Sequence, residues 1–433
     1  MKSTSPSLQQ QDVSQGFMDA AIRSLNASDD VNSATTVVAS KVRIISILQN
    51  ICFNMYIFKQ HTQIPNVSDA MNEDTSDVGR FEELIKNAKD PFELVKAEVD
   101  SIANEVKQIL GTKHKVLESV AQYFFDMDSG KKLRPVLVLL TSSAVNEHFR
   151  GSLKDSYVRI NPKQRRLAEI TEMIHTASLL HDDVLDMADT RRGAKSVNVL
   201  FGNKLAVLAG DFLLARASVC LARLRDVEVI ETLSTVIEHL VKGEILQMAG
   251  LNGHLPINSE FDSIQCFEDY TRKNYYKTGS LIANSIKSAA MLCPVPDSEE
   301  AEMEKVRQAV FNYGAHFGTM FQLIDDVLDF EGTVETLGKE PLADLRSGLT
   351  TAPVLFAQRE YPELTPIIAR KFESPGDVEH VAELVRKSGA CDEARKLAHA
   401  HAHLAMDSIC KLKQTDERDA LLRLVRLAVN RSK

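Results

Sequence analysis

The run DPFELVKAEVDSIANEVKQILG, residues 90–111, decides the fold class, because its apolar side chains recur at alternating steps of three and four. These side chains are Phe92, Val95, Val99, Ile102, Val106 and Ile109. Such spacing gathers them on one face of an α-helix. Asp90 and Pro91 are favourable as the N-cap and the first helical residue. The run therefore predicts an amphipathic helix packed on a core.

The same helical character continues along the chain. No proline occurs between Pro162 and Pro256, and that interval holds the long helix-compatible runs at 205–224 and 227–250. Alternating strand patterns between Asn-Gly turns are scarce. We therefore expect an all-α fold, with one large helical domain over residues 85–433 and no internal boundary.

The N-terminal residues differ in composition. Residues 1–84 are predicted to be a poorly ordered leader, because they are rich in Ser, Thr, Asn, Gln and Asp and show little periodicity. Mitochondrial transit peptides are rich in Arg and poor in acidic residues. The first forty residues instead hold Lys2 and Arg23 against four aspartates, so the leader itself does not argue for import.

Composition excludes some classes of protein. The chain has 433 residues, 44% of them hydrophobic, and a net charge of −9. This negative charge argues against a general nucleic-acid binder, which presents a basic field. The six cysteines lie far apart, without a CxxC pair, and read as reduced thiols. We found no run of about twenty apolar residues and expect no membrane span.

An acidic motif follows one of the apolar runs. In SLLHDDVLDMADTRRG, residues 178–193, Asp182, Asp183 and Asp186 stand at i, i+1 and i+4. On a helix, Asp182 and Asp186 project from one face, one turn apart, and repel each other. A divalent cation such as Mg²⁺ would turn that repulsion into attraction. A solvated acidic face explains a single motif of this kind equally well.

The same pentapeptide DDVLD occurs a second time. In FQLIDDVLDF it supplies Asp325, Asp326 and Asp329, again after an apolar helical run. Surface acidity gives no reason for the same five residues twice in one context. Two acidic helix ends that converge across a cavity could hold a diphosphate through several metal ions.

Basic motifs accompany the acidic ones. They are GKKLRP with Lys131, Lys132 and Arg134, TRRG with Arg191 and Arg192, YYKTGSL with Lys277 and Thr278, and LGKEPLADL with Lys339. Arginine suits bidentate phosphate contacts, and lysine acts as a compact charge. Singly, each could be an ordinary surface charge. Together they suggest two phosphate sites, one held through metal and one held directly by cations.

In this order, the motifs resemble those of the trans-prenyltransferases, the all-helical isoprenyl diphosphate synthases. The resemblance covers about residues 88–430. The wider text AEITEMIHTASLLHDDVLD, with ADTRRG and ADLRSGLTTAPVLFA, is most similar to the long-chain polyprenyl and solanesyl diphosphate synthases of quinone side-chain synthesis. The resemblance implies an isoprenoid-synthase-like bundle around a central apolar cavity. It also implies an enzyme that adds isopentenyl diphosphate to an allylic diphosphate.

The resemblance assigns a role to each matched residue. The metal ligands would be Asp182, Asp183, Asp186, Asp325, Asp326 and Asp329, which would hold two or three Mg²⁺ per active site. The allylic diphosphate would contact Arg191, Lys277 and Lys339. The diphosphate of isopentenyl diphosphate would contact Lys131, Arg134, His175 and Arg192. Thr278 and Gln322 would line the region where positive charge develops.

The implied reaction is ionisation, condensation and elimination. The growing isoprenoid needs an apolar channel, and positions one turn before Asp182 face the space below the metals. There the chain has the small residues Ala177 and Ser178, where aromatic rings would close the channel early. We therefore expect a product of C30 or longer, although Ala177 could instead serve close helix packing.

Several expectations rest on the resemblance alone. They are a homodimer, with a heteromer as the alternative, and a mitochondrial location, with plastid or cytoplasm as alternatives. Membrane association would arise only through the product. Rival functions are a short-chain geranyl or geranylgeranyl synthase, a non-catalytic partner subunit, a terpene cyclase, and a metal phosphohydrolase suggested by His175 with HDD. The triplet His399, His401 and His403 is interpreted as helix surface or interface, with metal binding a minor alternative.

Overall fold

The computed structural model describes residues 78–110, 119–120, 123, 132–191, 193–249, 263–333 and 340–431, all within the compact unit 64–433. The expected leader therefore lies outside the described residues up to position 77. Helix α4 already begins at Val78, and its Phe81 is buried in the core. The helical domain thus starts before residue 85, where the sequence had suggested its boundary.

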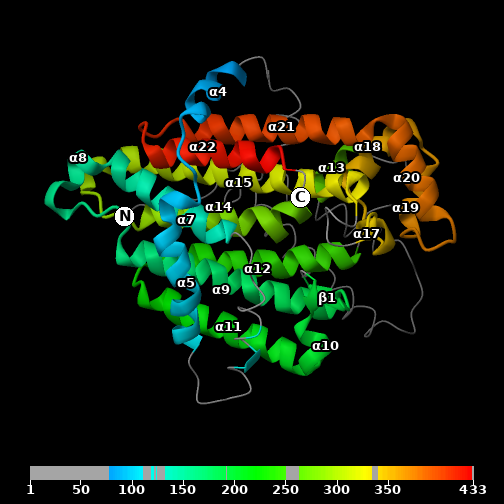
Figure 1. Ribbon diagram of the computed structural model, residues 1–433, viewed down its shortest axis with the longest axis horizontal. Coiled ribbons are helices and arrows are strands. Elements are labelled where there is room, and N and C mark those ends of the chain that lie inside the picture. Colours follow the sequence, from blue (N-terminus) through cyan, green and yellow to red (C-terminus); the bar gives the residue numbers. More distant parts are fainter. Residues whose placement is uncertain are drawn as a thin grey trace, which may run out of the picture. The chain divides into compact units, whose positions relative to one another are not determined.

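The all-α expectation is confirmed, and the only strands among the described residues are two of two residues each (Figure 1). The elements are α4 (Val78–Lys86), η2 (Glu93–Val95), α5 (Lys96–Leu110), α7 (Leu133–His148), α8 (Arg150–Leu153), η3 (Lys154–Ser156), α9 (Pro162–Leu185), β1 (Thr190–Arg191), β2 (Ala194–Lys195), α10 (Val197–Phe201), α11 (Asn203–Arg223), α12 (Val227–Ala249), α13 (Ser263–Asn274), η5 (Tyr275–Gly279), α14 (Ser280–Met291), η6 (Asp297–Glu299), α15 (Glu300–Glu331), α17 (Ala343–Arg346), α18 (Ala352–Glu360), α19 (Leu364–Ala369), α20 (Asp377–Ser388), α21 (Ala390–Ile409) and α22 (Asp416–Val429).

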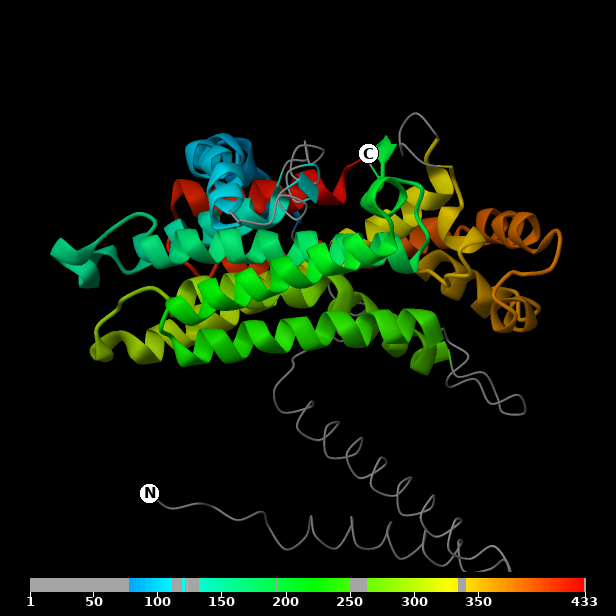
Figure 2. The same ribbon diagram turned by 90° about the horizontal axis from the view of Figure 1, so that it is seen from below.

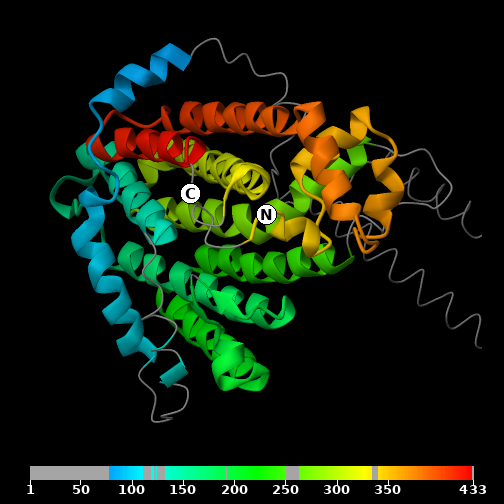
Figure 3. The ribbon, with the colours of Figure 1, turned by 45° about the vertical axis from the view of Figure 1, so that its right-hand side comes forward.

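The long helices run side by side as a bundle. Figures 1 and 3 show α21 and α22 along one side and α9 and α11 along the opposite side, with α12 and α14 between them. Figure 2 shows the short helices α17 to α20 gathered at one end. The C-terminal ends of α9 and α15 point toward this end, so both DDVLD motifs reach the same end of the bundle.

Local sequence signals explain where the decisive helices start. The carboxylate of Asp90 accepts hydrogen bonds from the backbone N–H groups of Phe92 and Glu93, at 2.9 and 3.2 Å, as an N-cap residue does. Helix α9 starts at Pro162 behind a capping box, in which Asn161 and Gln164 bond each other's backbone N–H. The Asp90 cap was expected, although the α-helix proper starts only at Lys96 after η2, and the capping box of α9 was not predicted.

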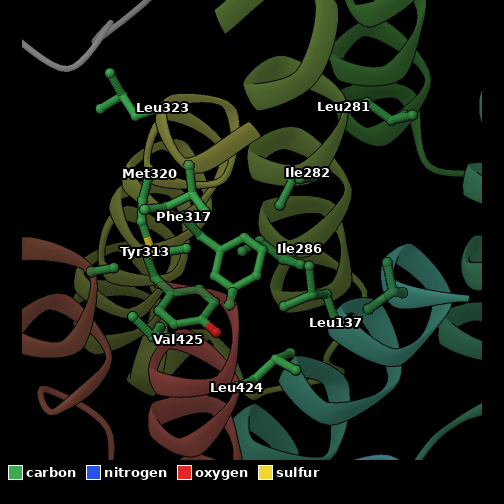
Figure 4. Close-up of a cluster of buried hydrophobic side chains, with 14 of the residues drawn as sticks. Leu137, Leu281, Ile282, Ile286, Tyr313, Phe317, Met320, Leu323, Leu424 and Val425 are labelled. Atoms are coloured by element: carbon green, nitrogen blue, oxygen red, sulfur yellow. The ribbon is translucent and has the colours of Figure 1, made fainter. Parts of the chain in front are cut away.

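The core lies where α15 packs against α14 and the C-terminal helices. Figure 4 shows the rings of Tyr313 and Phe317 on α15 facing Ile286 of α14 and Val425 of α22. The Tyr313 hydroxyl donates to the Leu421 carbonyl at 3.1 Å, which satisfies the one polar atom of this buried ring. The core therefore anchors the 32-residue helix that carries the second acidic motif.

Helix α11 bears on the expectation of no membrane span. Among the described residues, it is the one helix with the length and apolar composition of a membrane-crossing segment, and a single helix of this kind is weak evidence of a span. Its apolar window is 39% buried, and the helix packs against α9 within the bundle. The Asp211 and Arg216 side chains interrupt the run, which is why a simple scan for uninterrupted apolar residues missed it.

Helix α15 approaches the turn η5 backbone to backbone. A Cβ atom on Gly318 would lie 2.6 Å from the Cα of Gly279, so no side chain fits between these two elements. Because η5 carries Lys277 and Thr278, this contact fixes the position of two predicted site residues.

We predict that Gly318→Ala lowers the free energy of unfolding by about 1–3 kcal/mol, because the added methyl group must push α15 and η5 apart. Chemical denaturation followed by circular dichroism measures this loss. Gly151→Ala on α8 is the matched control, since its Cβ would meet nothing within 4 Å. Equal stabilities of the two variants would contradict the close contact.

Candidate active site

An apolar cavity of about 230 Å³ opens at the end of the bundle where the first acidic motif lies. Its mouth carries the polar residues, and its walls come from α9, α11 and α12. The lining residues are Ile174, Ser178, His181, Asp182, Leu185, Leu214, Ile237, Leu240, Val241, Glu244, Ile245, Met248 and Lys277. Apart from the His181 imidazole, no aromatic ring contributes to this lining.

The two predicted chain-length residues differ in position. Ser178 lies on the cavity wall, one turn before Asp182, as expected. Ala177 is fully buried and is not among the residues that line the cavity. The structure therefore supports the packing alternative for Ala177, and Ser178 is the small residue that keeps the wall open.

The first acidic motif divides into two faces. Asp182 lines the cavity, and Asp186 is the C-cap of α9 one turn later. Asp183, 2% exposed, points to the hairpin β1–β2, where Arg191 donates to both of its carboxylate oxygens at 2.7–2.9 Å. Asp183 therefore holds Arg191 at the rim, while Asp182 and Asp186 are left for a ligand.

The charge around Asp182 is unbalanced. Burial, Glu244 and the neighbouring Asp186 raise the pKa of Asp182 to about 7, against the opposing effect of Lys277 and Arg191. Burial also raises the pKa of Asp186. A bound divalent cation would offset the repulsion among these carboxylates and lower the pKa of Asp182, so the site favours a cation once the proton has left.

Lys277 extends from the π-helical turn η5 toward these carboxylates. Its ammonium forms an ion pair with the Glu244 carboxylate at 2.5 Å and donates to the Gln247 side-chain oxygen at 2.8 Å. Glu244 and Gln247 lie one turn apart on α12 and were missed in the sequence. A single carboxylate within the apolar run HLVKGEILQM is the signal that could have found them.

The neighbouring Thr278 connects η5 to the second acidic motif. Its hydroxyl donates to the Gln322 side-chain oxygen at 3.3 Å, and the Gln322 amide donates to Asp326 at 3.1 Å. The π-helical turn thus meets the first motif through Lys277 and the second through Thr278. This arrangement brings Lys277, Thr278 and Gln322 together as the resemblance predicted.

Two aspartates of the second motif are already held by protein donors. Asp326 is 2% exposed and accepts from the Tyr270 hydroxyl at 2.6 Å and from the Ala352 N–H at 3.1 Å. Asp329 accepts from the N–H of Asp344 at 3.1 Å. These contacts tie the segment of α17 and α18 to the end of α15.

The remaining aspartate of the second motif, Asp325, faces a different partner. The Arg431 guanidinium, near the C-terminus, contacts the Asp325 carboxylate at 2.5 Å and the Phe321 carbonyl at 2.8 Å. It also stacks on the Phe321 ring, 3.6 Å from the ring centre. Sequence reasoning missed Arg431, because nothing in the C-terminal text links it to the motif.

Arg134 and His175 form the second expected cluster of site residues. The Arg134 guanidinium lies 2.8 Å from His175 Nε2, and because guanidinium only donates, that nitrogen accepts. Burial, Arg134 and Arg191 together lower the pKa of His175 well below its ordinary value, so the ring is neutral. Burial lowers the pKa of Arg134, while the buried Glu172 on α9 and Asp325 on α15 act to raise it.

Three predicted site residues, Lys131, Arg192 and Lys339, lie outside the described residues. The interpretation of the histidine triplet as helix surface is partly wrong. His399 is exposed as expected, but His401 and His403 are buried, and His401 Nδ1 lies 3.0 Å from His316 Nδ1 on α15. The alternation of Ala and His had suggested surface, whereas α21 packs closely on α15 here.

The donor set fits a divalent cation of the Mg²⁺ type. Within the described part of the chain, no three acidic, His or Cys side chains form a ready set of metal ligands. The chemistry nevertheless agrees, because Asp182, Asp186 and Asp325 offer only hard oxygen ligands, and burial together with the neighbouring Glu244 and Asp186 raises the pKa of Asp182. The described cysteines are free thiols, as expected.

Comparisons with known proteins agree with this site. Residues 114–385 match the family model described as polyprenyl synthetase. The chain is 42% identical over 339 residues to solanesyl-diphosphate synthase 1, mitochondrial, of Oryza sativa subsp. japonica, covering 77% of this chain and 75% of that protein. It is 39% identical over 429 residues to the probable mitochondrial hexaprenyl pyrophosphate synthase of Yarrowia lipolytica, covering 87% and 92%.

A solved structure shares the fold. The polyprenyl synthase of Caulobacter crescentus, complexed with calcium and isoprenyl diphosphate, superimposes with a TM-score of 0.66 and 28% identity. The alignment covers 79% of this chain and 97% of that structure.

The raised pKa of Asp182 predicts a pH-dependent stability of the metal-free protein. Because its folded-state pKa, about 7, exceeds the ordinary value of 3.8, the protonated carboxyl stabilises the fold at low pH. This contribution is lost as the pH rises through 7. Thermal unfolding in chelator should therefore show a falling midpoint between about pH 4 and pH 7, and Asp182→Asn should reduce that slope, while Glu169, whose buried carboxyl has a pKa of about 8, still contributes to it.

Asp155→Asn, at an exposed position on η3, serves as the control and should keep the slope. A slope that survives unchanged in Asp182→Asn would contradict the assigned charge imbalance at the cavity mouth.

Proposed function

Because the chain belongs to the polyprenyl synthetase family, we propose that it adds isopentenyl diphosphate to an allylic diphosphate and builds a long all-trans polyprenyl diphosphate. It is a long-chain prenyltransferase of the kind that makes quinone side chains. One observation supports a product of C30 or longer. Among the described residues that line the cavity, the one aromatic ring is that of His181, so the described wall contains no Phe, Tyr or Trp ring that would close it early.

The allylic diphosphate binds at the cavity mouth in this proposal. Asp182 and Asp186 on one side and Asp325 on the other would hold Mg²⁺, which, when bound, neutralises the diphosphate and favours its departure. Lys277 leaves Glu244 to contact the diphosphate, and Arg191, fixed by Asp183, contacts it from the hairpin. Asp326 acts at a distance, because both of its oxygens accept hydrogen bonds from protein donors, and Asp329 Oδ2 accepts from the Asp344 N–H.

The second diphosphate, that of isopentenyl diphosphate, binds to Arg134 and His175, with Lys131 and Arg192 as the further residues that the resemblance assigns. Burial lowers the local dielectric and strengthens the attraction between Arg134 and an anion. A neutral His175 can donate from one ring nitrogen without adding charge. The two substrates would then lie with their hydrocarbon ends together at the cavity mouth.

The bond changes follow from this placement. The allylic C–O bond breaks, the double bond of isopentenyl diphosphate attacks the allylic carbon, and a proton leaves the new chain. Thr278 and Gln322 present oxygen atoms to the region where positive charge develops. The departing diphosphate is a suitable base for the proton, so no side-chain base is required. The apolar wall keeps water away from the cation.

The hydrocarbon tail grows into the cavity. From Asp182 past Ser178 to Ile174, α9 rises about 12 Å, which accommodates roughly two or three isoprene units of about 5 Å each. Val241 and Ile245 on the α12 wall are more than half exposed, so the cavity is open on that side. Longer tails therefore have room to continue.

The same exposed apolar side chains support a homodimer. Leu208 on α11 and Val241 and Ile245 on α12 are each 54–57% exposed, and burial against a second copy would remove this apolar surface from water. The proposed location is the mitochondrion, because the two relatives compared above bear that word in their names. A heteromer remains the alternative assembly, with this chain as the catalytic or the partner subunit.

The direct test uses purified protein, Mg²⁺, labelled isopentenyl diphosphate and allylic primers of C5 to C20, with products sized after dephosphorylation. We expect polyprenols of C30 or longer. Products that stop at C20 would favour the short-chain alternative. Phosphate release from nucleotides without isopentenyl diphosphate would favour a phosphohydrolase, and cyclic hydrocarbons from a primer alone would favour a terpene cyclase.

We further predict that Ser178→Phe shortens the product by at least two isoprene units, because the ring would fill the cavity one turn below Asp182. Reversed-phase chromatography of the dephosphorylated products measures the length. Ser178→Ala keeps the wall small and should leave the length unchanged. A full-length product from an active Ser178→Phe enzyme would show that the tail takes another path.

A further inference from the structure

Lys273 lies near the C-terminal end of α13, one turn before Lys277, and differs from the other cations near the site. Neither a hydrogen bond nor an ion pair connects its ammonium to any residue that the structure describes. Its ammonium instead faces Tyr270, whose ring centre lies 5.6 Å from Lys273 Nζ. The other cations nearby are paired, as in Lys277–Glu244, Arg191–Asp183 and Arg431–Asp325.

Lys273 lies beside the second acidic motif, because Tyr270, whose ring it faces, donates to the Asp326 carboxylate at 2.6 Å. The carboxylates of Asp326, Asp344 and Glu244 act to raise the pKa of its ammonium, and none of these described residues forms an ion pair with it. Burial is the largest effect on the group and lowers the pKa of the ammonium, and Lys277 lowers it further. The Lys273 side chain keeps part of its surface accessible.

A largely desolvated ammonium without a partner costs free energy, unless a ligand completes its coordination. The contact with Tyr270 offsets only a small part of that cost, because cation–π contacts contribute about 0.5–2 kcal/mol. Asp326 does not act as the partner, since its oxygens accept from Tyr270, Gln322 and the Ala352 N–H. The arrangement therefore suits an anion that binds next to Lys277, which follows one turn later and lines the cavity.

We propose that Lys273 binds the diphosphate group held between the two acidic motifs, as a second lysine beside Lys277. This inference rests on the proposed function and extends it, by adding a contact that none of the matched motifs contains. The ligand is the diphosphate of the allylic substrate or the inorganic diphosphate released from it. Two ammonium groups on successive turns would approach the anion from the α13–η5 side, opposite the carboxylates that hold the cations.

The test compares three variants of the full chain. Lys273→Met removes the charge and keeps an unbranched stem, and Lys273→Arg keeps a cation at the same place. Lys287→Met is the matched control, because the Lys287 ammonium on α14 also lies 5.6 Å from a ring centre, that of Phe311, and belongs to no acidic motif. Calorimetry with inorganic diphosphate and Mg²⁺ measures binding without turnover.

We expect Lys273→Met to weaken diphosphate binding by about 10- to 100-fold, the usual range for a lost charge-assisted hydrogen bond. Lys273→Arg should recover most of the affinity, and Lys287→Met should bind as the wild type does. In steady-state assays, the KM for the allylic primer should rise in Lys273→Met while the KM for isopentenyl diphosphate stays the same. A role confined to supporting Asp326 would lower the thermal midpoint and leave both affinities unchanged.

The inference would be overturned if folded Lys273→Met bound diphosphate as tightly as Lys287→Met does. Should Lys273→Met not fold, Lys273→Gln gives the same comparison with a polar side chain of similar length. The proposed function is judged separately. A wild type that makes no polyprenyl diphosphate refutes that function, whereas an active wild type with an unaffected Lys273→Met refutes only the role of Lys273.

Discussion

The repulsion between carboxylates gathered at one end of the bundle is the interaction on which the site depends. In the structure, several of these carboxylates are balanced by a basic side chain from a different element. Arg191 reaches Asp183 from the hairpin, Lys277 reaches Glu244 from the π-helical turn, and Arg431 reaches Asp325 from the C-terminus. These ion pairs fix three separate segments at the end of the bundle that carries the two acidic motifs. When a diphosphate binds with its cations, the diphosphate can pair with these basic side chains and the cations can pair with the carboxylates.

The two DDVLD motifs show that one pentapeptide can serve two purposes. In the first motif, Asp182 faces the cavity and Asp183 positions an arginine. In the second, Asp326 and Asp329 accept hydrogen bonds that fasten α17 and α18 to the end of α15. Identical residues therefore differ in role because the neighbouring helices present different donors to them.

The sequence patterns predicted the features that depend on residues close together in the chain. The three-and-four spacing and the Asp90 cap identified the first helices, and the repeated acidic motif identified the end of the bundle that carries the site. Tertiary neighbours could not be predicted in this way. Glu244 and Arg431 become relevant only because α12 and the C-terminus pack beside the motifs. His401 was predicted to be surface-exposed for the same reason, because its neighbour His316 on the covering helix lies 85 positions away in the chain.

The proposed arrangement of two diphosphate sites gives the elongation a direction. After each condensation, the only remaining diphosphate on the chain is the one that arrived with isopentenyl diphosphate, near Arg134 and His175. For the next cycle it must move to the mouth beside Lys277, and this move pushes the tail deeper by about one isoprene unit, roughly 5 Å. Because Ser178 is small, the first such step meets no obstruction. Product length is then set by the depth at which the apolar wall blocks the growing tail. The charged mouth does not set it.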